Sequence, residues 1–172
     1  MPHFDIFNGD ADGICAIHQI RLNNPQESNL VTGVKWDTLL FKNVTSVINS
    51  VLTDLGISSH ANRGPLLKLL KQSNTIHYYD HHFSGEIPES PLFHPHIDTS
   101  PDVCTSIIVD RCLQGVHHSW AIVASFGDNI HSSALKLADS LKLDTKEIEK
   151  LREMGELINY NSYGETKKDL YY

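Results

Sequence analysis

The chain has 172 residues, of which 40% are hydrophobic and 20% charged, and its formal net charge is −7. These values are typical of one globular domain, and they disfavour broad electrostatic binding of duplex nucleic acid, which normally needs a basic surface. No apolar run approaches the ~20 residues of a membrane span, and the first residues do not resemble a signal peptide, so a cytoplasmic protein without membrane contact is expected.

The first half of the chain alternates between strand-like and helix-like patterns. The expected strands are residues 3–8, 29–34, 47–52 and 75–79, and the expected helices between them are 14–21 and 58–72. The second of these helices is expected to carry Pro65 in its first turn, where proline is tolerated. This alternation predicts an α/β fold with a doubly wound, mainly parallel sheet and helices on both faces.

The second half begins with a segment rich in proline. Residues 83–101 contain four prolines and are interpreted as one long surface loop. Helices are expected at 102–113, 130–141 and 144–158, the last opened by a capping box at Asp144. The apolar run 120–126 fits a buried strand or a buried helix, and periodicity does not decide between them.

Acidic side chains stand at the ends of several of these segments. Asp10 and Asp12 follow the first strand, Asp54 and Asp80 end later strands, and Asp128 closes the apolar run. Because parallel strands with right-handed crossovers end at one edge of a sheet, these carboxylates are expected to converge. Carboxylates packed together repel unless a cation neutralises them. Together with imidazoles they suit Mn²⁺, Mg²⁺ or Zn²⁺, and two such ions would form a clamp for displacement at phosphorus.

Other interpretations of these acidic positions stay open. Residues 8–19 nearly match a calcium-binding EF-hand loop, but they lack its final Glu and its entering helix. Asp12 could also N-cap the helix that follows it, a role compatible with metal binding. Taken singly, Asp54 and Asp128 are ordinary turn residues, and Asp80 could cap a turn beside two solvated histidines. Only their combination indicates a site.

The other histidines and the cysteines are interpreted as structural. His77 is expected to pack along its strand. Four histidines in loop-like sequence are expected to be solvated: His94, His96, His117 and His118. The chain contains no CxxC pair, so its three cysteines are expected to be buried thiols of a reducing compartment: Cys15, Cys104 and Cys112.

The order of the acidic motifs resembles that of the DHH phosphoesterases. The matching segments are Asp10-Ala11-Asp12-Gly13, Asp54, Asp80-His81-His82 and Gly127-Asp128. This superfamily includes RecJ-type exonucleases, nanoRNases, cyclic-dinucleotide phosphodiesterases and family II pyrophosphatases. The resemblance covers nearly the whole chain and implies a catalytic DHH domain over residues 1–164. Such a domain would hydrolyse a phosphodiester or phosphoanhydride bond in a short oligonucleotide or nucleotide through a metal-activated hydroxide.

The resemblance also implies a role for each motif residue. Asp10 and Asp12 would each bind one ion of a two-metal site, most naturally Mn²⁺, with Mg²⁺ as an alternative, and Asp54 would bridge both ions. His81 would be a further ligand, and Asp128 would complete the shell of the second ion. Asp80 would be a ligand or an acceptor that orients His81. The residues expected to contact the substrate phosphate are His82, Asn8, Thr105 and Ser106, and those counted as catalytic are Asp54, Asp80, His81 and His82.

The chain departs from the family pattern in two places. Pyrophosphatase-like members carry a His four residues before the first motif Asp, where this chain has Ile6, and this disfavours that branch. Family members usually continue into a Gly-rich substrate-binding domain, so residues 165–172 are expected to begin a linker to an absent domain. The alternative function is therefore a degenerate or truncated DHH domain that binds metal or nucleotide without turnover. The expected partner is a phosphorylated small molecule or short single-stranded oligonucleotide, and a homodimer is left open.

Overall fold

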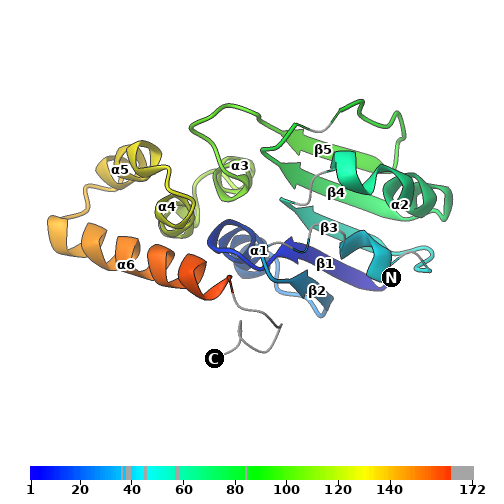
Figure 1. The fold of residues 1–172 in the computed structure, drawn as a ribbon, viewed down its shortest axis with the longest axis horizontal. Coiled ribbons are helices and arrows are strands. Elements are labelled where there is room, and N and C mark those ends of the chain that lie inside the picture. Colours follow the sequence, from blue (N-terminus) through cyan, green and yellow to red (C-terminus); the bar gives the residue numbers. More distant parts are fainter. Residues whose placement is uncertain (36, 38–39, 45, 57–58, 84, 164–172) are drawn as a thin grey trace.

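Five parallel strands form the centre of the molecule (Figure 1). The computed structural model describes residues 1–163, apart from 36, 38–39, 45, 57–58 and 84; the expected linker at 165–172 lies outside the described residues. The strands are β1 (His3–Asn8), β2 (Asn29–Gly33), β3 (Val51–Leu55), β4 (Thr75–Asp80) and β5 (Phe93–Ile97). Their order is β2-β1-β3-β4-β5, which confirms the predicted doubly wound α/β fold. The direction of winding reverses between β1 and β3, where ligands collect in such sheets.

Helices cover both faces of the sheet. They are α1 (Ala11–Asn23), the 3₁₀ helix η1 (Leu40–Val44), α2 (Ser59–Lys71), α3 (Thr105–Cys112), α4 (His118–Gly127), α5 (His131–Ser140) and α6 (Thr145–Asn161). On one face, Leu66 and Leu69 of α2 pack with η1 against Ile76 and Tyr78 of β4. On the other face, α1 and α3 pack against Phe7 and Leu55. Successive side chains of each strand point to opposite faces of the sheet, so each strand contributes residues to both cores.

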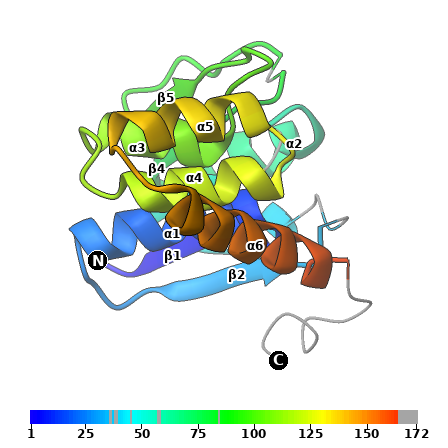
Figure 2. The same ribbon diagram turned by 90° about the vertical axis from the view of Figure 1, so that its left-hand side faces the viewer.

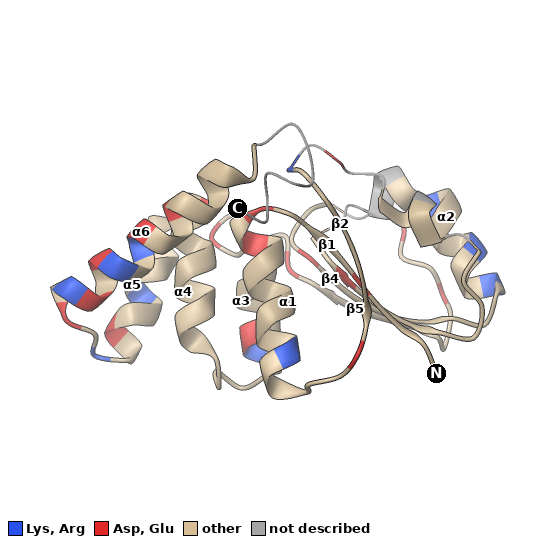
Figure 3. Cartoon of the chain, turned by 90° about the horizontal axis from the view of Figure 1, so that it is seen from below, with Lys and Arg blue, Asp and Glu red and all other residues tan. Residues whose placement is uncertain are grey.

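The helices on the α1 side are stacked in layers. Figure 3 shows α1 and α3 next to the sheet, α4 on their far side from the sheet, and α5 and α6 farthest from it. Figure 2 views the molecule from this outer side, with α4, α5 and α6 in front of the strands. The residues of α4 from Ala121 to Gly127 are all buried, because this helix has neighbours on several sides. None of the helices in the described ranges combines the length and the apolarity that a membrane crossing requires.

The structure decides or corrects several expectations about elements. The undecided run 120–126 lies in α4 and is helical. The segment 83–101 is not one loop, because residues 93–97 form the edge strand β5. Pro65 is the seventh residue of α2 and lies beyond its first turn. Pro65 has no backbone N–H, so the helix lacks one hydrogen bond at this position. The residue before it, Gly64, has open space around it.

One of the cysteines and three of the histidines are placed differently than expected. Cys15 and Cys104 are buried as predicted, but Cys112 is exposed at the end of α3. His94 and His96 belong to β5, so they are strand residues. His118 is largely buried, with its Nδ1 2.7 Å from Oδ2 of the buried Asp110. The placements of the three histidines follow from β5, which was interpreted as part of a loop, and from α4, which stayed undecided.

Helices α4 and α6 approach so closely that only glycine fits between them. A Cβ atom on Gly155 of α6 would lie 2.2 Å from the carbonyl oxygen of Val123 and 2.9 Å from the amide nitrogen of Gly127. Replacing Gly155 with alanine is therefore expected to lower the free energy of unfolding by about 1–3 kcal/mol, the usual cost of overpacking. Urea denaturation measures this change. Gly64→Ala is the control: its Cβ would meet nothing within 4 Å, so a gain of up to ~1 kcal/mol is expected. Equal behaviour of the two variants would contradict the close packing.

Candidate metal centre

Asp10 lies in the tight turn that joins β1 to α1 at the carboxyl edge of the sheet. Its carboxylate accepts a hydrogen bond from the amide of Gly13 at 3.0 Å and so caps α1, a role that the sequence assigned to Asp12. The turn needs glycine, because a Cβ on Gly13 would lie 2.1 Å from the carbonyl oxygen of Asn8. The entering element is a strand, which disagrees with an EF-hand loop.

Asp12 caps a different helix, far away in the sequence. Its two carboxylate oxygens accept the backbone amides of Thr105 at 2.9 Å and Ser106 at 2.7 Å, at the amino end of α3. Asp12 is 4% exposed, so these bonds replace water around a buried charge. Gln19 supports the same helix end by donating to the carbonyl and the hydroxyl of Ser106. The acidic turn after β1 and the start of α3 are therefore one connected unit.

His81 brings an imidazole to this carboxylate from the end of β4. Its Nδ1 lies 3.4 Å from Oδ2 of Asp12 and 3.0 Å from Oγ1 of Thr105, and its Nε2 lies 4.0 Å from Oδ2 of Asp128. Burial by itself lowers the pKa of His81, but the hydrogen bond and charge of Asp12, helped by Asp128, raise it to about 9. Without a metal, His81 is thus the cation that balances the neighbouring carboxylates at neutral pH.

Asp128 completes the group from the opposite side. It is the C-terminal cap of α4, so it follows a helix and does not end a strand. Burial, with the charges of Asp12 and Asp10, raises the pKa of Asp128 to about 6. The pKa of Asp10 is raised as well, chiefly by burial and then by Asp12. The site therefore contains more negative charge than its surroundings neutralise easily.

Lys35 is a member of the site that sequence reasoning missed. It follows β2, and its Nζ lies 3.8 Å from Oδ2 of Asp10 and 2.9 Å from Oδ1 of Asn159 in α6. No motif singles it out. Its place after a parallel strand, at the same sheet edge as Asp10, is the signal that could have identified it.

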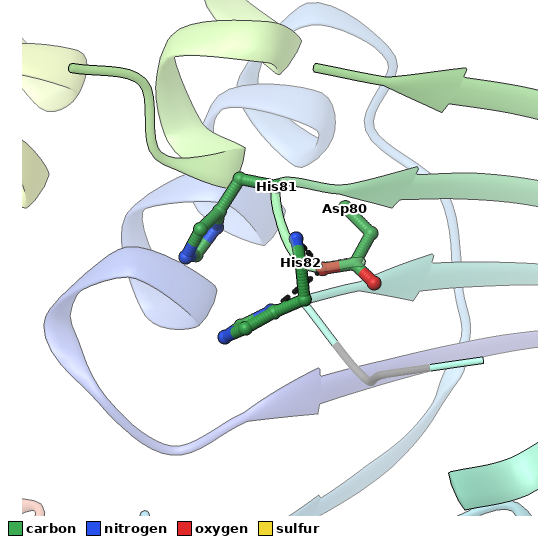
Figure 4. A group of neighbouring side chains, drawn as sticks. All are labelled: Asp80, His81 and His82. Carbon is green, nitrogen blue, oxygen red and sulfur yellow. Dashed lines mark hydrogen bonds and ion pairs between the residues drawn. The ribbon is translucent and has the colours of Figure 1, made fainter. Parts of the chain in front are cut away.

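Asp80 and His82 form a separate pair beside His81. One carboxylate oxygen of Asp80 accepts the backbone amide of His82 at 3.0 Å and contacts its Nδ1 at 2.8 Å, and Tyr78 donates to the other oxygen. Figure 4 shows both bonds between Asp80 and His82, with the ring of His81 pointing elsewhere. Asp80 therefore orients His82, and the expectation that it orients His81 is wrong. Half of the His82 side chain is exposed, at 51%.

The remaining predicted residues lie at the margins of this arrangement. Asp54 is fully buried within β3, on the side of the sheet that also carries Leu52. Asn8 ends β1 and donates from Nδ2 to the carbonyl of Lys35 at 3.4 Å. Thr105 and Ser106 are both fully buried and hold Asp12 and His81. The two backbone amides and the hydroxyl of Thr105 therefore act on the candidate ligands from within the protein, whereas the hydroxyl of Ser106 is bonded to Gln19.

Two overlapping groups of described residues have ligand atoms close enough to share an ion. Asp12, His81 and Asp128 form one group and Asp80, His81 and His82 the other, with the atoms of each group within 4.8 Å of one another. Among the described residues, these groups include four of the six predicted ligands, Asp12, Asp80, His81 and Asp128. Carboxylate oxygens with one or two imidazoles fit Mn²⁺, Mg²⁺ and Zn²⁺ alike. The donor set therefore fits a divalent cation without selecting one.

Comparison with known proteins adds no relative to this picture. No model of a protein family matches the chain, and no curated protein matches it either. The function of this chain is therefore inferred from its own residues and their geometry.

Proposed function

We propose that the protein is a phosphoesterase that depends on a divalent metal, with Mn²⁺ preferred and Mg²⁺ as the alternative. The observation that carries this proposal is the meeting of Asp12, His81 and Asp128, which arrive from three separate elements at one edge of the sheet. The buried carboxylates of Asp12 and Asp10, with the partly buried Asp128 beside them, favour a bound cation. The ordered motifs that resemble the DHH phosphoesterases point to the same chemistry.

The residues around this group would bind and orient a phosphate ester. Lys35 supplies a cation next to Asp10, and His82, held by Asp80, presents a half-exposed imidazole that would donate to a phosphate oxygen. Bound divalent ions would supply Lewis acidity and lower the pKa of a water molecule at this edge. The buried Asp12 and His81 hold their positions through α3 and so keep the site preorganised.

A neighbouring cavity supports a nucleotide or short oligonucleotide as the substrate. It has a volume of about 350 Å³ and lies next to Asp128, between the end of α4 and the end of α6. Its wall includes the exposed aromatic rings of Tyr160 and Tyr163, which are 78% and 48% exposed. Aromatic rings of this kind stack on nucleic acid bases. A base held here would place its phosphate toward Asp128 and Lys35.

Hydrolysis of bis-p-nitrophenyl phosphate with Mn²⁺ tests the proposal. The unaltered chain is expected to release p-nitrophenol, and Asp128→Asn is expected to lower the rate by about 10- to 100-fold, because it weakens one side of the metal shell. Asp139→Asn is the matched control, since Asp139 is an exposed residue of α5 that belongs to neither group of possible ligands. Hydrolysis that is absent, or that Asp128→Asn leaves unchanged, would refute the proposal.

A binding protein without turnover is the second candidate. It is favoured by the small size of each possible ligand group, since three described side chains make up each one. A centre of this size could hold one ion and a nucleotide without activating water. Calorimetric titration with a dinucleotide and Mn²⁺ separates the candidates: binding with no cleavage over the same period supports the second.

We also propose a cytoplasmic location, in keeping with three free cysteines.

A further inference from the structure

The face of β4 and β5 that looks toward α3 carries several imidazoles and lies apart from the candidate centre. We propose that Cys112, His96 and His94 bind Zn²⁺ there, with His77 as a neighbouring imidazole. This inference is independent of the proposed phosphoesterase activity. It uses residues that the candidate centre does not use.

Strand pairing gathers the three imidazoles on one face. His77 of β4 is paired with His94 of β5, and Tyr79 is paired with His96. Each pair stacks ring on ring, with centroids 4.9 Å apart for the two histidines and 4.6 Å apart for Tyr79 and His96. His94 and His96 are two residues apart on one strand, so they point to the same side of the sheet. Helix α3 lies on this side.

The thiol of Cys112 lies within hydrogen-bonding distance of one of these imidazoles. Its Sγ lies 3.5 Å from Nδ1 of His96. Two ligands of a tetrahedral zinc ion, a sulfur at ~2.3 Å and a nitrogen at ~2.0 Å, lie about 3.5 Å from each other. The pair is therefore already spaced as two corners of a zinc site, without movement of either backbone.

The surroundings provide the third ligand and a path for the ion. His94 is exposed in the described structure, so its ring can turn toward the thiol of Cys112, which is exposed as well. His94 lies on β5, the edge strand of the described sheet, and the exposure of both side chains leaves a path for the ion from solvent. Water would take the fourth position, as it does in zinc sites with three protein ligands. A thiolate and imidazoles select Zn²⁺ over Mn²⁺ or Mg²⁺.

The protonation states agree with a ligand role and disagree with a cysteine nucleophile. Burial, followed by the charge of His94, lowers the pKa of His96, and burial followed by His94 and His96 lowers that of His77. The lowered pKa values of His96 and His77 favour the neutral imidazole, which is the form that binds a metal. Burial raises the pKa of Cys112, so the pair is a thiol and an imidazole, and not the thiolate–imidazolium pair of a cysteine hydrolase. When zinc binds, the thiol proton passes to the buffer as the Zn–S bond forms.

Titration with Co²⁺, followed by displacement with Zn²⁺, tests the site through the thiolate-to-cobalt absorption band in the near ultraviolet. The unaltered chain is expected to show the band, and Zn²⁺ is expected to abolish it. Cys112→Ser should remove the band, whereas Cys104→Ser should keep it, because Cys104 is buried beside Asp12. A missing band in the unaltered chain, or a band that survives Cys112→Ser, overturns the proposal.

Histidine variants make the test independent of the thiol. His94→Gln is expected to weaken Zn²⁺ binding at least about 10-fold, and His3→Gln, on β1, should leave it unchanged. Asp128→Asn should leave the cobalt band intact, which separates this site from the candidate centre. Far-ultraviolet circular dichroism confirms that each variant is folded. Equal zinc affinity in His94→Gln and the unaltered chain would exclude His94 as a ligand and overturn the site as proposed.

Discussion

Replacing Asp12 with asparagine is expected to lower Mn²⁺-dependent hydrolysis by about 100- to 1000-fold and the free energy of unfolding by roughly 1–3 kcal/mol. Asp12 is the carboxylate on which the proposed centre depends most, because it contacts His81 and receives two backbone amides of α3. An asparagine keeps the size of the side chain but removes the charge. Its NH2 group, which donates hydrogen bonds and cannot accept one, would then face one of the two backbone N–H donors.

The effect of Asp12→Asn is measured by hydrolysis of bis-p-nitrophenyl phosphate and by urea denaturation of the same preparation. Asp144→Asn is the matched control, because Asp144 also caps a helix through its carboxylate, at the exposed start of α6. Asparagine is as good an N-cap as aspartate, so this variant should change neither quantity appreciably. If Asp12→Asn kept the hydrolytic rate of the unaltered chain, Asp12 would not belong to a catalytic centre.

The metal-free protein is expected to lose stability as the pH rises, which is opposite to ordinary acid denaturation. The pKa of His81 is raised to about 9 in the folded chain, compared with 6.5 for an ordinary histidine. Its contribution is therefore complete below about pH 6.5 and lost as the pH rises to about 9. It amounts to at most about 3 kcal/mol, since one pKa unit corresponds to ~1.4 kcal/mol. Asp128, whose pKa is raised to about 6, adds a loss in the same direction between about pH 4 and 6.

Urea denaturation in the presence of EDTA, repeated from pH 5 to about 9, measures this dependence. His81→Gln should flatten the curve above pH 6.5, whereas His3→Gln should preserve it. Added Mn²⁺ should reverse the trend, because the ion competes with protons for His81 and Asp128 and so binds more tightly at high pH. A stability of the metal-free chain that rises between pH 6.5 and 9 would show that His81 is not held as an imidazolium beside Asp12.

Local patterns in the sequence predicted much of the sheet. The strand expected at 3–8 matches β1, and that expected at 75–79 lies within β4, because both alternate between two buried faces. β5 was missed because Pro95 disfavours a strand. As the edge strand of the described sheet, β5 tolerates a proline whose missing amide faces away from β4. Helix α4 stayed undecided because its neighbours bury it on several sides, so no polar face marks its period.

The candidate centre was predictable in its members more than in its contacts. The acidic residues at strand ends follow from the rule that ligands collect at one edge of a parallel sheet. The contact between Asp12 and α3 joins residues that are 93 and 94 positions apart, and no local pattern encodes such a distance. The pairing of Asp80 with His82, and the arrival of Lys35 and Asp128, likewise depend on how separate elements pack.

The distance between Asp12 and its donors in α3 also has a consequence for the order of folding during synthesis. Strands β1, β2 and β3 are complete by residue 55, but the amides that donate hydrogen bonds to Asp12 are made about 50 residues later. Until then, the turn after β1 carries two adjacent carboxylates without their helix partner, and closing so long a loop costs entropy. We therefore expect the amino-terminal half not to fold stably until α3 has been made. The docking of α3 would then complete the core and assemble the centre in one step.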